Sequence, residues 1–315
     1  MSDMQPKAHP DRVVQALQAG EAALSPLVAS WSRSARLHGL DPSAKYLPTR
    51  MTEAEFRQAH ERSEPLLRIA EPTLDRLFKL VQGFGGCVML ADADGVPVDR
   101  RGRAGDDQDF EDCGLWTGTI WTEAQAGTNG IGTCIADGRG VTIHKDQHFL
   151  ASNIGLSCTS APIHDSQGQL TAVLDVSSAS ESLTRDVARL VSQSTAEAAR
   201  RIEADYFRAS FPGARFLLAP GVERGQGALL AVDADELVVG ATRAARKHLG
   251  LSGDLSANPV PAADLLGFDA HESAEEAERA VLLRALSRAG GNVSAAARAL
   301  GISRATFHRK LGPRA

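Results

Sequence analysis

The stretch NVSAAARALGISRATFHRKL, residues 292–311, predicts two short helices joined by a tight turn. Gly301 can adopt the left-handed backbone that such a turn needs, and Ser303 is a favoured N-cap for the second helix. Ala297 is small where the two helices approach each other, and Phe307 and Leu311 continue the buried face at a spacing of one helical turn. The pattern is that of a helix-turn-helix, whose second helix reads the major groove of DNA.

The second helix of this stretch would present a polar and basic surface. The residues expected to contact DNA are Arg304, Thr306 and His308 at base edges, Arg309 and Lys310 at phosphates, and Ser303 at the helix start. The alternative is a basic amphipathic hairpin that only packs against the rest of the chain.

Charge is distributed unevenly along the chain, whose formal net charge is −5. Residues 279–315 contain no Asp or Glu and eight basic residues: Arg279, Arg284, Arg288, Arg298, Arg304, Arg309, Lys310 and Arg314. The rest of the chain therefore carries −5 − 8 = −13. An acidic body with a compact basic end is expected when one small module approaches a polyanion.

Residues 272–311 resemble the Fis-type helix-turn-helix at the C-terminus of bacterial enhancer-binding activators. The resemblance implies a homodimer whose two recognition helices bind an inverted-repeat operator in double-stranded DNA. Just upstream, Ser273 and Glu276 have the spacing of a capping box and predict a helix that ends at Gly290-Gly291.

The middle of the chain alternates between short β-like runs and turn residues. The runs cover residues 87–92, 96–100, 141–144, 160–165 and 170–177, and Asp94-Gly95 and Gln167-Gly168 lie between paired runs, as hairpins require. Apolar spacing predicts helices over 65–81 and 183–207, while Thr52 and Glu55 form a capping box that would start another helix at residue 53. The expected fold is multidomain α+β: an antiparallel sheet with flanking helices, plus a C-terminal all-α helix-turn-helix.

Four segments are expected along the chain: an N-terminal helical segment over residues 1–64, a sensory domain over 65–207, a linker over 208–270 and a helix-turn-helix domain over 271–315. Within the linker, LLAVDADELVVGATRAARKHLGL predicts strand, Asp turn, strand and helix. The segment is therefore expected to be either a linker or a small PAS-like module.

Residues 121–177 resemble the GAF domain of acetoin- and glycerol-catabolism activators. The likeness rests on GTNGIGT (127–133), His148-Phe149, CTSAP (158–162) and Leu174-Asp175, and it extends over most of residues 25–205. It implies an antiparallel sheet with a small cavity on one face, suited to a small-molecule effector. The candidate lining residues are Trp121, Asn129, Ile131, His144, His148, Phe149, Cys158 and Asp175.

Each of these features has a simpler structural interpretation. GTNGIGT lacks the Lys-Ser/Thr of a phosphate-binding loop and can serve only as a glycine-dependent turn. His144, His148 and Cys158 could share a metal, yet histidines in a loop are more often hydrogen-bonded scaffold, so neither metal nor cofactor is expected. Cys158 could also be a redox switch, which would make the chain a cysteine-based redox sensor or a GAF-type enzyme resembling free methionine-sulfoxide reductases. An architectural Fis-like protein without a ligand is a third alternative.

The related activators carry a central ATPase between sensor and DNA-binding module. Neither GxxxxGK[ST] nor GAFTGA occurs in this sequence. We therefore expect no ATPase activity and no enzymatic function. The chain would instead recruit or block RNA polymerase directly, or modulate a full-length related activator at shared sites.

Composition excludes some other classes. The sequence is 43% hydrophobic and 23% charged, and no apolar run is long enough to span a bilayer. The N-terminus MSDMQPKAHPDRVVQAL carries charge and proline where a secretory signal needs a continuous apolar stretch. The four cysteines, Cys87, Cys113, Cys134 and Cys158, include no CxxC pair. A cytoplasmic location without membrane contact is expected.

Overall fold

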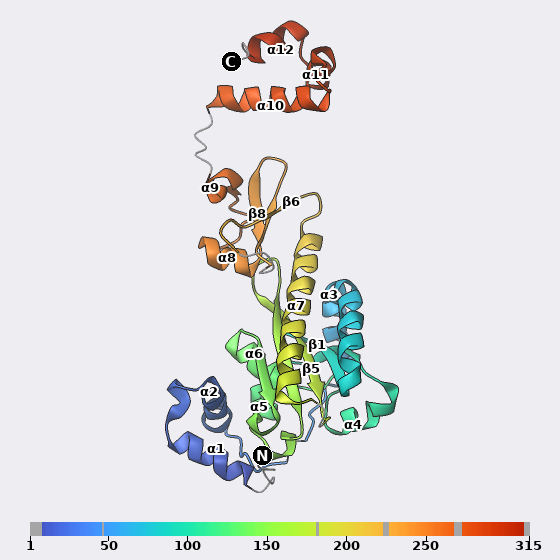
Figure 1. Ribbon diagram of the computed structural model, residues 1–315, viewed down its shortest axis with the longest axis vertical. Coiled ribbons are helices and arrows are strands. Elements are labelled where there is room, and N and C mark those ends of the chain that lie inside the picture. Colours follow the sequence, from blue (N-terminus) through green and yellow to red (C-terminus); the bar gives the residue numbers. More distant parts are fainter. Residues whose placement is uncertain (1–7, 46, 181–182, 223–226, 268–272, 312–315) are drawn as a thin grey trace. The chain divides into compact units, whose positions relative to one another are not determined.

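The computed structural model describes residues 8–45, 47–180, 183–222, 227–267 and 273–311 (Figure 1). The chain divides into two compact units, Met1–Val260 and Pro261–Ala315. No helix within the described ranges is long and apolar enough to cross a membrane.

A five-stranded antiparallel sheet forms the centre of the first unit. Its strands are β1 (Gly86–Asp92), β2 (Pro97–Arg101), β3 (Val141–His144), β4 (Ser157–His164) and β5 (Leu170–Ser178), in the order β2-β1-β5-β4-β3. All five predicted runs are confirmed, although β4 begins three residues earlier than expected. In the first hairpin, the Asp92 carboxylate accepts hydrogen bonds from the backbone N–H groups of Asp94 and Val96, each at 3.0 Å. The predicted turn therefore has its own side-chain acceptor.

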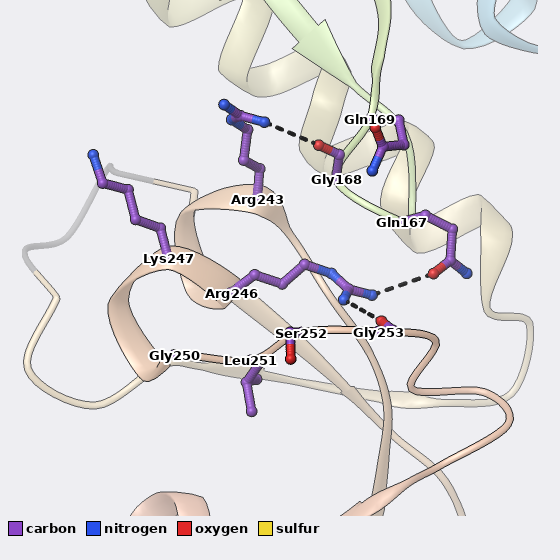
Figure 2. Close-up of a pocket in the computed structure, with 10 residues that line it drawn as sticks. All are labelled: Gln167, Gly168, Gln169, Arg243, Arg246, Lys247, Gly250, Leu251, Ser252 and Gly253. Atoms are coloured by element: carbon purple, nitrogen blue, oxygen red, sulfur yellow. Dashed lines mark hydrogen bonds between the residues drawn. The ribbon is translucent and has the colours of Figure 1, made fainter.

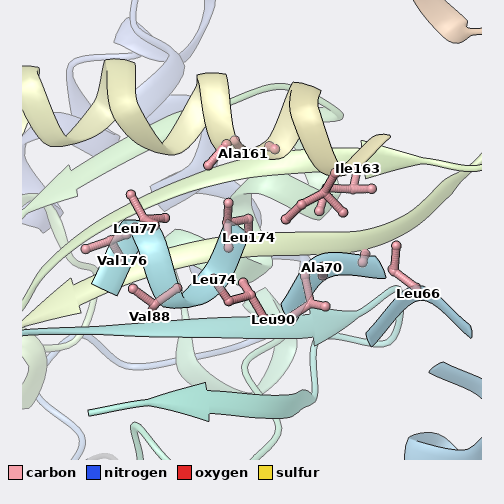
Figure 3. Packing of buried hydrophobic residues seen from close by; sticks show 14 of the residues in the cluster. Leu66, Ala70, Leu74, Leu77, Val88, Leu90, Ala161, Ile163, Leu174 and Val176 are labelled. Atoms are coloured by element: carbon pink, nitrogen blue, oxygen red, sulfur yellow. The ribbon is translucent and has the colours of Figure 1, made fainter. Parts of the chain in front are cut away.

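Two long helices, α3 (Glu53–Val81) and α7 (Arg185–Ser210), cover one face of this sheet, which we call the helix-side face. Leucine and alanine side chains of α3 pack against branched residues of β1, β4 and β5, as Figure 3 shows. The labelled members of this core are Leu66, Ala70, Leu74, Leu77, Val88, Leu90, Ala161, Ile163, Leu174 and Val176. Residues of each strand alternate between the two faces, so both faces of the sheet are buried.

Helix α3 differs from the prediction of separate helices starting at residues 53 and 65. The Thr52–Glu55 capping box is present, but the helix continues through Pro65 and Pro72 to Val81. A proline inside a helix removes one backbone hydrogen bond, and here the apolar stripe on both sides of Pro65 packs on the sheet and offsets that cost. The expected boundary between residues 64 and 65 therefore falls inside one continuous helix.

Short helices and N-terminal elements cover the opposite face, which we call the loop-side face. They are α1 (His9–Gln18), α2 (Pro26–Ser32), α4 (Asp107–Asp112), α5 (Glu123–Ala126) and α6 (Gly130–Asp137). Single turns of 3₁₀ helix occupy Glu21–Ala23, Gln82–Phe84, Ala104–Asp106, Lys145–Gln147 and Ala151–Asn153, and a π turn occupies Arg33–Leu37. The N-terminal helices are anchored here: the Trp31 indole N–H donates to the Gln147 carbonyl at 2.9 Å, and Arg33 pairs with buried Glu123.

A second, smaller sheet follows α7. It contains β6 (Arg215–Leu218), β7 (Leu229–Val232), β8 (Leu237–Ala241) and β9 (Val260–Pro261), in that order across the sheet, with α8 (Arg243–Leu249) after β8. The expected order of strand, Asp turn, strand and helix is confirmed, with Asp233 accepting from the backbone of Asp235 and Leu237. Phe207 of α7 is buried against Phe216 of β6, with ring centroids 6.0 Å apart, so this segment is a folded module with its own core.

The second unit contains α9 (Ala262–Leu266) and three longer helices, α10 (Ala274–Arg288), α11 (Val293–Ala299) and α12 (Arg304–Leu311). Helix α10 begins directly after Ser273, as the capping-box spacing predicts, although the side chain of Glu276 lies outside the described part. The three long helices enclose a small core made of Leu282, Ala285, Ala296, Ala297 and Phe307.

Candidate functional sites: a recognition helix and a covered sheet face

Caps and one glycine fix the angle between α11 and α12. The Asn292 side chain accepts from Ala295 N–H at 3.1 Å and starts α11, while Ser303 Oγ accepts from Thr306 N–H at 3.0 Å and starts α12. Between them, Gly301 has φ of +67°, which a residue with a Cβ adopts only with strain. Phe307, fully buried, fills the angle between the helices. The local folding that the sequence predicted is thus confirmed.

The outward face of α12 is basic and exposed. Arg304, His308 and Arg309 are exposed, and none forms an ion pair with any residue that the structure describes. Guanidinium groups left in solvent on a short helix retain their full capacity to bind phosphates or base edges.

Three other residues predicted to contact DNA already have protein partners. The Ser303 and Thr306 hydroxyl oxygens lie 2.8 Å apart, so both belong to the cap of α12. Lys310 pairs with Glu278 of α10. Among the described residues, Arg304, His308 and Arg309 are therefore the basic side chains of α12 that have no protein partner.

A row of side chains crosses the loop-side face of the large sheet. Arg100 of β2 is paired with Met89 of β1, Met89 with Asp175 of β5, and Asp175 with Ser160 of β4. Neighbouring strands are about 4.8 Å apart, and β1 lies between β2 and β5. The backbones of Arg100 and Asp175 are therefore roughly 10 Å apart. The sheet thus places one cation and one carboxyl on the same buried face.

Asp175 lies at the middle of this row and is 1% exposed. Its two oxygens accept hydrogen bonds from Ser160 Oγ at 2.5 Å and Ser177 Oγ at 2.6 Å. Burial raises the pKa of the Asp175 carboxyl to about 6, against the smaller lowering effect of the two hydroxyl donors. Gly130 covers the carboxyl closely, because a Cβ at Gly130 would lie 2.7 Å from Asp175 Oδ1.

Cys158 and His148 form a neutral pair on the same side of the sheet. His148 Nδ1 lies 2.9 Å from the Lys145 carbonyl and must donate to it, so Nε2 accepts from the Cys158 thiol at 3.4 Å. Burial lowers the pKa of His148 to about 4, and burial together with nearby Asp175 raises the pKa of the Cys158 thiol well above its usual value. Both groups are therefore uncharged near pH 7.

Four other predicted lining residues are buried in the same layer, and three have clear structural roles. The Trp121 indole N–H donates to the Gly114 carbonyl at 2.8 Å, and Asn129 caps α6 by accepting from Gly132 N–H at 2.8 Å. Phe149 packs closely over Gly127, the left-handed residue of GTNGIGT. Ile131 belongs to the core of this layer. The glycine-dependent turn expected of GTNGIGT is present.

His144 does not join this group. Ile143 is paired with Cys158, so the next residue, His144, points to the helix-side face, where it lines a cavity of about 590 Å³ with Arg185 and Arg189 of α7. Its Nδ1 lies 2.9 Å from Ser157 Oγ. The metal site considered for His144, His148 and Cys158 is therefore divided between two faces, and no metal-binding cluster occurs among the described residues.

Sequence reasoning missed Arg100. Its guanidinium lies over the Trp116 ring at 4.4 Å from the centroid and over the Phe110 ring at 5.0 Å, and it pairs with Asp107 through Nη1. Its Nε and Nη2 are buried without a hydrogen-bond partner among the described residues. Buried N–H groups without acceptors are uncommon and costly. A charged residue in a strand normally suggests solvent exposure, so the sequence carried no signal for it.

Two protein families match this chain, one over its N-terminal and central part and one at its C-terminal helices. Residues 5–198 match the family described as "MimR, N-terminal domain", and residues 273–312 match "Bacterial regulatory protein, Fis family". The acetoin catabolism regulatory protein of Cupriavidus necator is 35% identical over 278 residues, which cover 84% of this chain and 41% of that protein. The MimR activator of the propane 2-monooxygenase operon in Mycolicibacterium smegmatis is 32% identical over 149 residues, covering 46% of this chain and 24% of MimR.

Among solved structures, the E. coli DhaR(N)–DhaL complex contains a chain of similar fold. The TM-score is 0.52 at 18% identity, over 72% of this chain and 77% of that chain, which supports the fold alone. The chain spans about two fifths of the length of the C. necator regulator. With a MimR N-terminal domain over most of its length and a Fis-type helix-turn-helix at its end, this chain belongs to the family of MimR- and acetoin-type bacterial transcriptional regulators.

Proposed function

We propose that this protein binds an inverted-repeat operator as a homodimer, with α12 as the recognition helix. The observation that carries this proposal is the capped α12, which buries Phe307 and leaves Arg304, His308 and Arg309 exposed and unpaired within the described residues. Arg304 would contact a base edge, because it occupies the first turn of the helix, and Arg309 would contact a phosphate. Two copies would place two such helices about one turn of DNA apart.

The proposed effector site is the buried layer on the loop-side face. Arg100 supports it, because its Nε and Nη2, which have no hydrogen-bond partner among the described residues, call for an acceptor oxygen beside a guanidinium that lies over the rings of Phe110 and Trp116. Asp175, held partly protonated by its raised pKa, is a second polar group of this layer. The effector would be a small uncharged or anionic molecule with at least one carbonyl, hydroxyl or carboxylate oxygen.

Regulation would be by occupancy in the cytoplasm, without ATP hydrolysis. No Walker A sequence or GAFTGA motif occurs between the two matched domains. The bound dimer would therefore recruit or block RNA polymerase, or share sites with a longer related activator. The effector would change DNA affinity only if it binds more tightly to one of two states of the dimer, the one that binds DNA or the one that does not.

Burial of three of the four cysteines argues against a thiol-based sensor, and Cys113 is the partly exposed one. The reactive form of cysteine is the thiolate, and burial raises the pKa of the thiols of Cys87, Cys134 and Cys158. No catalytic step is proposed for any of them.

The effector proposal is tested with acetoin as the probe, since a regulator of acetoin catabolism is among the relatives. Fluorescence anisotropy would follow the full chain binding to DNA from upstream of its own gene, with and without acetoin. We expect acetoin to change the affinity of the wild type, and Arg100→Gln to abolish the change while DNA binding persists. Arg200→Gln, an exposed arginine of α7, is the matched control. An equal response of Arg100→Gln and wild type would refute the role of Arg100.

A further inference from the structure

A basic pocket lies where the β4–β5 turn of the large sheet meets α8 and the loop that follows it. Its volume is about 520 Å³, within the range of roughly 300–1,000 Å³ typical of small-molecule sites. Figure 2 shows its lining: Gln167, Gly168, Gln169, Arg243, Arg246, Lys247, Gly250, Leu251, Ser252 and Gly253. None of these residues belongs to the loop-side face or to α12, so the pocket is separate from both sites described above.

Three cations and no anion line this pocket. Arg243, Arg246 and Lys247 have no ion pair with any described residue, and no Asp or Glu is among the lining residues. Two carboxylates nearby are occupied by their own turns. Asp165 accepts from the backbone of Gln167 and Gln169, and Asp254 accepts from the backbone of Ser256. Both carboxylates act electrostatically on Arg246, but neither lines the pocket or forms an ion pair with its cations, so the three cations still outnumber the two nearby carboxylates.

The hydrogen bonds divide the three cations into one fixed and two available groups. Arg246 is held by the Ala241 carbonyl at 2.9 Å, the Gly253 carbonyl at 2.8 Å and Gln167 Oε1 at 3.4 Å. Burial lowers its pKa, but an arginine remains charged at neutral pH.

Arg243 and Lys247 are the available groups. Arg243 uses one N–H, which donates to the Gly168 carbonyl at 3.2 Å, and Lys247 makes no hydrogen bond to a described residue. They are four residues apart on α8 and project from the same side of the helix, as Figure 2 shows. A guanidinium fork beside an ammonium group matches the oxygen geometry of a phosphate or carboxylate.

We propose that this pocket is a second ligand site, which binds a small metabolite through a phosphate or carboxylate group held by Arg243 and Lys247. Arg246 forms the wall of the site and gives it a positive field. A ligand here touches both the β4–β5 hairpin and α8, so its binding free energy stabilises the contact between the large sheet and the smaller module. The site therefore offers a second input to the chain, independent of the effector layer.

Isothermal titration calorimetry of the full chain without DNA tests the site, with inorganic phosphate and succinate as separate probes and sodium chloride at matched ionic strength as the salt control. We expect at least one probe to bind, and the double variant Arg243→Ala/Lys247→Ala to weaken that binding at least about tenfold, because two charge-assisted contacts are lost. Arg200→Ala, which removes an exposed arginine elsewhere, should leave it unchanged.

Each outcome of the titration either supports or overturns the proposal. Binding of phosphate or succinate that the double variant loses supports the site and identifies the group that it takes. Failure of both probes at millimolar concentration, or equal binding by the wild type and the double variant, overturns the proposal. The exposed arginines of α12 and the Arg100 site are unchanged in the double variant, so only the part of the binding that this variant loses is assigned to the pocket. A circular dichroism spectrum like that of the wild type establishes that the double variant is folded.

Discussion

The two compact units place their functional groups in opposite ways. In the unit up to Val260, Asp175, His148 and the side chain of Arg100 are buried on a sheet face, and their state depends on burial and on neighbours far away in sequence. In the unit from Pro261, a core centred on Phe307 supports a helix whose basic side chains are exposed. The first arrangement suits recognition of a small molecule, and the second suits a large polyanion. Substitutions should therefore act on the first unit through pKa and packing, and on the second through charge.

The largest effect is expected from Phe307→Ala. Removing a fully buried aromatic side chain costs about 3–5 kcal/mol, and a core of this size supplies little more than that. The variant should lose the folded helix-turn-helix and all specific DNA binding, while the unfolding transition of the larger unit stays unchanged. Circular dichroism melts together with DNA titrations measure this. Leu283→Ala, which is 47% exposed on α10, is the control. Persistence of specific DNA binding in Phe307→Ala would show that Phe307 does not hold α12.

The next largest effect is a pH dependence of the stability of the larger unit, which comes from Asp175. The folded Asp175 has a pKa of about 6, above its unfolded value of about 3.9, so folding takes up a proton between these values. Its contribution to stability is fully present below about pH 4 and is lost as pH rises through about 6. The free energy of unfolding of the wild type, relative to Asp175→Asn, should fall by up to about 3 kcal/mol between pH 4 and 7.

Urea unfolding at several pH values measures this difference. The opposite contribution of His148, whose pKa is lowered to about 4, is present in both proteins and cancels. Asp235→Asn, at an exposed turn, is the control for removal of one carboxylate charge. A constant difference between wild type and Asp175→Asn across this range would contradict the raised pKa.

A smaller effect on DNA affinity is expected from breaking the ion pair between α12 and α10. Lys310 is paired with Glu278, and an exposed ion pair contributes at most about 1 kcal/mol. Glu278→Gln should free the ammonium group for a phosphate and raise DNA affinity several-fold at low salt. Glu275→Gln removes the same charge from α10 without breaking an ion pair, so it should raise affinity less. Equal gains in the two variants would mean that net charge, and not release of Lys310, is responsible.

The smallest effect is expected at the cysteines. Because the pKa of the Cys87 thiol is raised to about 12 and that of Cys158 is raised well above its usual value, neither should form thiolate near pH 8. Iodoacetamide should leave Cys87, Cys134 and Cys158 unmodified in the folded protein and label them in denaturant, as mass spectrometry would show. Rapid alkylation of Cys158, or a change of DNA affinity with peroxide, would restore the redox-sensor hypothesis.

Local patterns in the sequence predicted most of the fold. Short β-like runs bounded by turn residues located every strand of the large sheet, and the Thr52–Glu55 and Ser303 caps marked helix starts that the structure confirms. Helix α3 was divided wrongly, because its continuity through Pro65 depends on tertiary packing that a local pattern does not contain. Strand β6 was missed because it is short and lies within a glycine- and proline-rich segment.

The buried site was harder to predict than the recognition helix. His144 was grouped with Cys158, but the pairing of Ile143 with Cys158 places the two on opposite faces, and a register shift of one residue would reverse this. Arg100 was overlooked because its burial depends on Phe110 and Trp116, which reach it from a separate segment. The DNA-contacting residues, the effector site and the four segment boundaries remain predictions.

The central claim is that α12 reads DNA, and a salt titration of binding to upstream DNA tests it most directly. The wild type should bind one site specifically, with affinity that falls steeply as salt increases, because each phosphate contact releases counterions. Arg304→Ala should cost about 1–3 kcal/mol and lose specificity, whereas Arg309→Ala should weaken binding to all sequences and reduce the salt slope by about 1. Arg200→Ala should match the wild type. Weak binding of equal strength by all four proteins to every sequence would contradict the account.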